Sequence, residues 1–173
     1  MSSRRARQRQ QHPRRAATNA VQIAINGAMR LSDSDTAGHV ALITRALAEF
    51  SRGIDCARHW LSLADTANMA ETLASMGLGS GHEADRVVMT AQQALADVHL
   101  RHTQRGTWTL WADEIDALTW LVRLHATQLG ACSYREFDTA YKRTADRVAQ
   151  ARAGNAPAGA IVVIGQVGTQ PAA

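Results

Sequence analysis

Apolar side chains recur every three or four residues through most of this chain, which is the spacing of one side of an α-helix. The first such stripe consists of Val40, Ile43, Leu47, Phe50 and Ile54. Asp33, Ser34 or Asp35 precedes it and can cap the helix start by accepting backbone N–H groups. Gly53 interrupts the pattern near its end. We therefore expect a first long helix that begins near residue 33.

Four further stripes predict helices at about 56–76, at 82–104, from about 112 to Gly130, and at 134–152. Trp60 and Trp120 lie on apolar stripes and are expected to be core anchors, since each ring can bury on the order of 200 Å². In the last stripe the residues expected to face inward are Phe137, Ala140, Tyr141, Val148 and Ala151. A shorter helix is expected at about 17–30, where Asn26–Gly27 weakens the pattern.

Glycines and one capping motif mark where these helices end. Gly77, Gly79 and Gly81 follow the second long helix, and Gly106 follows the third. Ser133 and Glu136 have the spacing of a capping box, which begins the last helix, and Gly154 ends it. Thr107 to Trp111 alternates polar and apolar residues and is expected to be an extended connector.

The sequence thus predicts an all-α protein, a compact bundle of about five helices joined by short loops. We place one helical domain at 17–155, an Arg-rich flexible arm at 1–16, and an extended apolar segment with a tail at 156–173. The last segment contains Ala160–Ile161–Val162–Val163–Ile164, fenced by glycines and without an evident partner strand. We expect it to pack as an extended clip across the bundle.

Charge is unevenly distributed along the 173 residues, whose formal net charge is +4. Six positive charges lie in the first 15 residues, and no acidic residue precedes Asp33. They belong to Arg4, Arg5, Arg7, Arg9, Arg14 and Arg15. The remaining 13 basic and 15 acidic residues leave a slightly acidic body. Such an arm can contact nucleic acid or another acidic surface, because arginine pairs with phosphate and releases counterions. The alternative is a solvated tail that only aids solubility.

Two helical pairs could contribute metal ligands. Cys56 and His59 are three residues apart, as are His99 and His102, so each pair can project from one helix face. The sequence holds no Cys-x-x-Cys, His-Glu-x-x-His or Glu-x-x-His motif, and the two cysteines have no catalytic signature around them. We therefore expect free thiols, no metal site and no cofactor, and keep a metal-dependent hydrolase as the least favoured alternative.

Other polar and aromatic residues allow a functional and a structural interpretation. His125 lies on an inward stripe, where a buried, hydrogen-bonded histidine is more common than a catalytic one. Asp65, Asn68 and Glu71 can line a pocket or, more commonly, form the solvated edge of their helix. Trp108 and Trp111 flank the connector and can anchor a partner, although packing over helix ends is the more usual role of such rings.

Two stretches resemble a known group of proteins. One is His59-Trp-Leu-Ser-Leu-Ala-Asp-Thr-Ala-Asn-Met-Ala-Glu-Thr-Leu with Gly77-Leu-Gly. The other is Trp120-Leu-Val-Arg-Leu-His-Ala-Thr-Gln-Leu with Cys132-Ser-Tyr-Arg-Glu-Phe. Over about residues 40–166 the chain resembles uncharacterised helical proteins encoded by phages and prophages of proteobacteria. The resemblance implies a small accessory protein of the bacterial host cytoplasm and no particular activity.

Three functions remain open, in descending order of support from the sequence. The first is a non-enzymatic binding protein whose arm contacts nucleic acid. The second is an inhibitor or adaptor that grips a host or phage protein through Trp108 and Trp111. The third is the metal-dependent hydrolase. The chain has no secretory signal and no stretch of about 20 apolar residues, so we expect a cytoplasmic protein without a membrane partner. A homo-oligomer remains possible.

Overall fold

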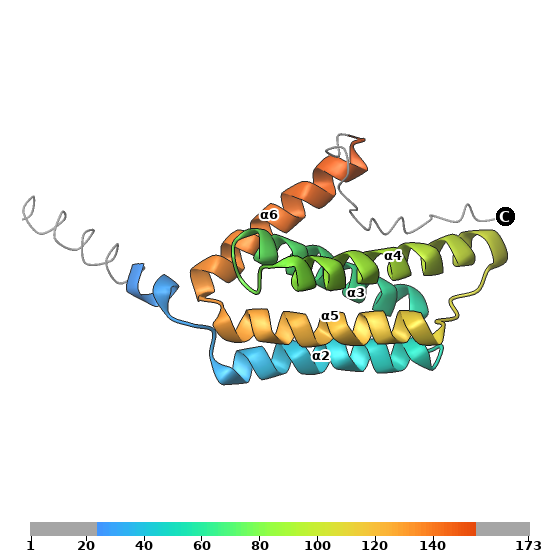
Figure 1. The fold of residues 1–173 in the computed structure, drawn as a ribbon, viewed down its shortest axis with the longest axis horizontal. Coiled ribbons are helices and arrows are strands. Elements are labelled where there is room, and N and C mark those ends of the chain that lie inside the picture. The colour runs from blue at the N-terminus through green and yellow to red at the C-terminus, as the bar shows by residue number, and fades with distance from the viewer. Residues whose placement is uncertain (1–23, 155–173) are drawn as a thin grey trace, which may run out of the picture.

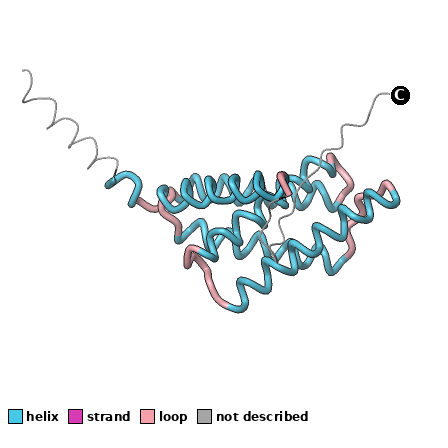
Figure 2. The backbone as a smooth tube through the Cα atoms, turned by 90° about the horizontal axis from the view of Figure 1, so that it is seen from above, coloured by secondary structure: helices cyan, strands magenta, loops and turns pink. Residues whose placement is uncertain are grey.

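The computed structural model describes residues 24–154, and these fold into helices joined by short loops (Figure 2). The five long helices are α2 (Asp33–Ser51), α3 (Cys56–Ser75), α4 (His82–Arg105), α5 (Ala112–Ala131) and α6 (Tyr134–Arg152). Residues 24–28 form a short helical turn before them. Within the described residues there is no strand, only an isolated bridge between Arg30 and Ser133. The prediction of an all-α bundle of about five helices is confirmed.

Helix α3 is the centre of the bundle, because it packs against α2, α4, α5 and α6. Helices α2 and α5 lie side by side, and α4 packs on α5 from the other side (Figure 1). Helix α6 packs chiefly against α3 and is inclined away from the remaining helices (Figure 1). One long face of α6 is therefore left without a helical partner within the described chain.

The core consists of two apolar clusters, one toward each end of the bundle. The larger one surrounds Trp60, whose ring is buried and whose Nε1–H donates to the Leu95 carbonyl over 2.9 Å. The hydrogen bond removes the penalty of burying the indole N–H, so the ring keeps its full hydrophobic stabilisation. The smaller cluster gathers Leu31, Leu73, Leu129 and other side chains from α3, α5, α6 and the segment before α2. Trp60 is confirmed as a core anchor.

Helix boundaries follow the local signals in most places. The Ser133 hydroxyl accepts from the Glu136 N–H, and the Glu136 carboxylate accepts from the Ser133 N–H over 2.8 Å, so the predicted capping box is present. Gly77, Gly79 and Gly106 have positive φ angles where α3 and α4 end, as expected of glycine at helix ends. Residues 107–111 form the expected irregular connector.

The two ends of α2 correct the sequence analysis. Ser32, and not Asp33, Ser34 or Asp35, caps this helix by accepting from the Asp35 N–H over 3.1 Å. Helix α2 ends at Ser51, and Ile54, which was placed on its inward stripe, is exposed. Gly53 takes a positive φ angle of 76° and turns the chain away before the apolar repeat is completed.

Two aromatic residues expected in the core lie on the surface instead. Trp120 is 55% exposed and Tyr141 is 64% exposed. Trp120 precedes the buried Leu121 by one position, and Tyr141 follows the buried Ala140 by one position. One position along a helix turns a side chain by about 100°, which directs both rings away from the core. The prediction failed because apolar periodicity indicates a face but does not say how much of it neighbouring helices cover.

Several sequence predictions concern residues on which the structure makes no statement. The six arm arginines and the apolar run Ala160–Ile164 lie outside residues 24–154, as does half of the short helix predicted at 17–30. In residues 24–154 no helix combines the length and the apolar character needed to cross a membrane.

Candidate functional site

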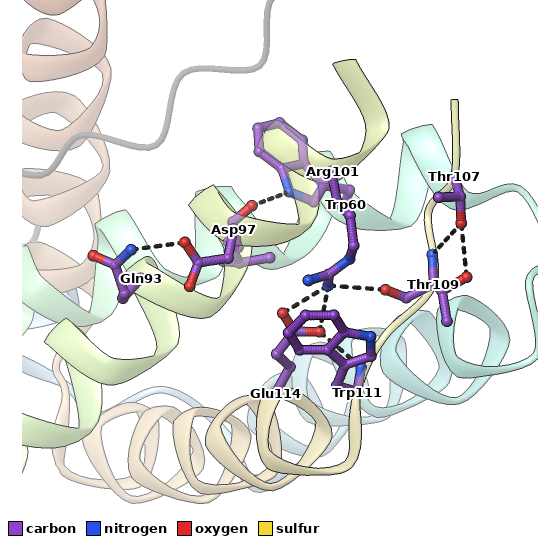
Figure 3. A network of polar contacts seen from close by, with 9 residues as sticks. Trp60, Gln93, Asp97, Arg101, Thr107, Thr109, Trp111 and Glu114 are labelled. Carbon is purple, nitrogen blue, oxygen red and sulfur yellow. Dashed lines mark hydrogen bonds and ion pairs between the residues drawn. The ribbon is translucent and has the colours of Figure 1, made fainter. Parts of the chain in front are cut away.

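Trp111 is exposed but fixed in place from two sides (Figure 3). It occupies the N-cap position of α5, where its side chain cannot accept a hydrogen bond from the helix. The backbone N–H of Trp111 donates to Glu114 Oε2 over 2.7 Å. The Arg101 guanidinium lies over the indole ring, 4.0 Å from the ring centroid, in cation–π geometry. The hydrogen bond fixes the backbone at Trp111, and the guanidinium holds the ring, although the residue is 54% exposed.

The group that fixes Trp111 is a buried ion pair. Arg101 Nη2 donates to both carboxylate oxygens of Glu114 over 2.6 Å and to the Thr109 carbonyl over 3.0 Å. Both charged side chains are almost fully buried. Because removing one partner of such a pair leaves an uncompensated charge, the arrangement tolerates little movement. Trp111 therefore presents a large apolar surface that has already lost much of its conformational freedom, as residues that anchor protein partners commonly do.

A groove runs from Trp111 between α4 and α5. It consists of two hollows of about 480 and 250 Å³, which share the residues Thr90 and Ala117 and therefore adjoin each other. Trp111 lines one hollow and Trp120 the other. We call this surface the tryptophan groove; Met89, also exposed, lies on its α4 side. The Arg123 guanidinium lies 5.0 Å from the Trp120 ring centroid.

The charge of the tryptophan groove is negative. Among its lining residues Glu83, Asp97 and Asp113 outnumber Arg86, with the paired Glu114 set aside, while Arg123 lies over Trp120 beside the groove. Phosphate groups would be repelled by this surface, whereas a segment with apolar and basic side chains is complementary to it. The lining of the groove is therefore better matched to apolar and basic side chains than to phosphate groups.

The structure separates the two tryptophans that the sequence analysis grouped as partner anchors. Trp108 is partly buried against the larger core cluster, with its ring centroid 5.9 Å from that of Trp60. It also stacks on the His102 ring, centroid to centroid 4.0 Å and nearly parallel. Trp108 therefore closes the end of the core. Trp111 is accompanied instead by Trp120, whose exposure the sequence pattern did not reveal.

The candidate metal ligands are engaged elsewhere. His59 Nε2 lies 2.8 Å from Glu49 Oε2. The His99 ring stacks on Trp60 at 4.9 Å, and burial lowers the pKa of His99. Burial also raises the pKa of the Cys56 thiol, which disfavours the thiolate that metals bind. Within residues 24–154, no group of three or more histidine, cysteine or acidic side chains is arranged to hold a metal ion.

His125 is a buried structural histidine within a small polar network. Its Nδ1 lies 3.4 Å from Gln128 Oε1. The Gln128 amide donates to the carbonyls of Ala70, over 2.9 Å, and Leu78, over 3.1 Å, which links α5 to α3 and to the following loop. Burial lowers the pKa of His125 to about 4, so the ring is neutral at pH 7. Sequence reasoning identified His125 but missed Gln128, since the two carbonyls that the Gln128 amide binds are 50 or more positions away in the chain.

The polar residues on α3 have three different roles. Asn68 is buried, contrary to its assignment to a solvated edge. Glu71 is partly buried and accepts from Arg147 Nη2 over 2.7 Å and from Gln92 over 2.8 Å, which connects α3 to α6 and α4. Asp65 is exposed and lines a different groove, between α2 and α6. Only this last residue fits the interpretation of a pocket-lining side chain.

The segment that leads from the arm into the bundle is anchored. The Leu31 N–H donates to the Cys132 carbonyl over 2.9 Å, and the Tyr134 N–H donates to the Met29 carbonyl over 3.0 Å. The Leu31 side chain is buried in the smaller core cluster. The chain at Met29–Leu31 therefore lies beside the turn between α5 and α6.

No protein-family model matches this chain, and no curated protein or solved structure is significantly similar to it. The resemblance to phage and prophage proteins therefore stays a prediction.

Proposed function

We propose that this chain is a non-enzymatic binding protein whose Arg-rich arm contacts nucleic acid, and that it acts as a phage-type accessory protein in the bacterial cytoplasm. The observation that carries the proposal is the segregation of charge. Residues 1–15 hold six arginines and no acid, while the rest of the chain has 13 basic and 15 acidic residues. Nucleic acid is the polyanion that such an arm suits best, because each phosphate contact releases counterions.

The body supports this proposal because acidic residues outnumber its 13 basic ones and ion pairs neutralise several of those cations. Arg101 and Arg147 are occupied by Glu114 and Glu71, and Arg45 by Glu49. The one lysine, Lys142, pairs with Asp138 over 2.7 Å. The tryptophan groove adds negative charge on one side of the molecule. The arm is therefore the part of the chain best suited to attract a phosphate backbone.

Binding of fluorescein-labelled double-stranded and single-stranded DNA over a salt series tests the proposal. The triple variant Arg4→Ala, Arg5→Ala and Arg7→Ala should weaken binding to both and lower the slope of log K against log salt by up to about 3. The matched control replaces three exposed body arginines, Arg52, Arg105 and Arg143, by alanine. Equal losses of affinity in the two triple variants would contradict a specific role of the arm.

A second candidate function is a protein-binding adaptor or inhibitor, which the rigid presentation of Trp111 favours. The apolar hollows and the surrounding Glu83, Asp97 and Asp113 suit a partner segment that alternates apolar and basic side chains. The test is capture from a nuclease-treated bacterial lysate with the full chain. A partner retained by the wild type should be lost with Trp111→Ala and kept with Tyr141→Ala, which removes an equally exposed ring elsewhere. Retention of the same partner by both variants excludes the tryptophan groove as its site.

A further inference from the structure

A second groove lies between α2 and α6, above α3, and has a volume of about 530 Å³. Its lining is mainly apolar and includes Leu42, Ile43, Met69, Phe137, Tyr141 and Val148. The inclination of α6, visible in Figure 1, opens this space, because α6 packs chiefly on α3. It is separate from the tryptophan groove, since the two share no lining residue.

The exposed side chains along this groove are unusual for a surface that faces only water. Leu42 is 68% exposed and Tyr141 faces it from α6 as part of the same lining. Contiguous apolar surface of this kind commonly marks an interaction site. One acidic and one basic side chain, Asp65 and Arg152, also belong to the lining. Although Asp65 is exposed, the surrounding groove partly desolvates its carboxyl and raises its pKa, which Arg152 only partly offsets.

We propose that the groove between α2 and α6 binds the chain's own apolar run, Ala160–Ile164, in an extended conformation. The run consists of one alanine and four β-branched residues, which favour extended backbone. No charged residue occurs from 155 to 173, so the segment can enter an apolar groove without desolvating a charge. The arm, with its six arginines, would have to desolvate several charges to enter the same groove.

The length of the connecting chain fits this site. Gly154 follows the end of α6 with a φ angle of 77°, a conformation that reverses the chain after a helix. The five residues between Gly154 and Ala160 allow the run to begin up to about 20 Å from Gly154. From Arg152 back to Phe137 the helix extends about 22 Å, so the run can reach most of the groove. Asp65 can accept, and Arg152 can donate, hydrogen bonds to an extended backbone.

Tethering also favours this occupant over a second copy of the chain. A short linker holds its segment near the groove at an effective concentration in the millimolar range, far above that of a separate chain at ordinary protein concentrations. The two occupants give different products in a cross-linking experiment. This inference is independent of the proposed nucleic-acid contact, because it concerns different residues and a different readout.

The test uses the full chain with Tyr141→p-benzoylphenylalanine, which cross-links to nearby C–H groups on illumination. Trypsin releases residues 153–173 as one peptide, because no Lys or Arg follows Arg152. We expect a monomeric cross-linked product in which fragmentation places the bond within residues 160–164. Adding Val162→Asp should reduce this product on the order of tenfold, since a carboxylate would have to enter the apolar groove.

The matched control is Val167→Asp, which makes the same change in the same segment but beyond Gly165. It should leave the cross-link yield unchanged. Circular dichroism of each variant confirms that the bundle is folded. A cross-linked dimer, a bond to any other part of the chain, the absence of a bond to residues 160–164, or equal losses with the two aspartate variants would each overturn the proposal.

Discussion

Single buried polar residues determine how this molecule responds to mutation and pH. Arg101 and Glu114 pair in a site that excludes water and hold the exposed Trp111 at the start of α5. His125 is buried without charge and is bonded to Gln128, which in turn satisfies carbonyls of α3 and its following loop. The ion pair thus acts by positioning Trp111, and Gln128 acts by joining α5 to α3 and the following loop.

Breaking the pair of Arg101 and Glu114 should cost far more than replacing it as a whole. Glu114→Leu leaves a buried guanidinium without its anion and should lower the free energy of unfolding by about 3–5 kcal/mol. The double variant Arg101→Met with Glu114→Leu should be considerably more stable than the sum of the two single changes predicts. Urea unfolding of the four proteins measures this coupling. Additive effects would show that the two residues do not stabilise each other.

The neutral His125 should make the protein less stable as the pH falls from 6.5 toward 4. The unfolded chain binds a proton near pH 6.5, whereas burial holds the folded-state pKa at about 4. Below pH 6.5 the unfolded state therefore binds more protons than the folded state. The free energy of unfolding keeps its full value above that pH and decreases below it, by about 2 kcal/mol at pH 5. Urea unfolding between pH 5 and 7 should show the decline, which His125→Gln should flatten.

The comparison must allow for His99, whose pKa burial also lowers and which contributes in the same direction. His99→Gln is therefore the matched control and should flatten the profile less, since His99 is less deeply buried than His125. The pKa values of the Asp35, Glu49 and Glu136 carboxyls are lowered, so their contributions are lost only at more acidic pH. An identical decline in wild type and His125→Gln would contradict the assignment.

At the scale of helices, the sequence predicts boundaries better than it predicts faces. Ranges were correct to within one or two residues for α3, α4, α5 and α6, because glycines and the Ser133–Glu136 box are local signals. The predicted burial of Trp120 and Tyr141 was wrong, since burial depends on which other helices cover that face of the helix. The site at Trp111 was found only in part: nothing local in the sequence relates Arg101 to Glu114, which the chain brings together across the connector.

The start of α6 should depend strongly on its capping box. Ser133→Ala removes the acceptor for the Glu136 N–H and should lower the free energy of unfolding by about 1 kcal/mol. The loss matters because α6 packs chiefly on α3, although bonds from Tyr134 to the Met29 carbonyl and to Asp35 also hold its first turn. Hydrogen exchange should accelerate in residues 134–138 before it changes in α3. Ser80→Ala, an exposed loop change, is the control and should alter neither quantity.

At the scale of the whole molecule, the proposed function assigns folding to the helical body and binding to the arm. The buried residues of both core clusters lie between Leu31 and Ala140. All residues of these clusters belong to the part of the chain that the structure describes, and we expect the bundle to fold without the arm. Composition leads to the arm, which stays a prediction, but it could not locate the surfaces of the body: charge segregation is visible along a chain, whereas a groove requires packed helices.

Removing the arm should therefore separate binding from folding. A chain that begins at residue 16 should keep its melting temperature, because it loses no buried side chain of the described core, while its affinity for DNA falls. A chain that begins at Ser32 keeps the cap of α2 but loses buried Leu31 and its hydrogen bond to Cys132. Calorimetry should show its melting temperature lower by on the order of 5–10 °C. If the shorter deletion alone destabilises the bundle to this extent, the arm is part of the folded body, and its arginines have a structural role in place of the nucleic-acid contact.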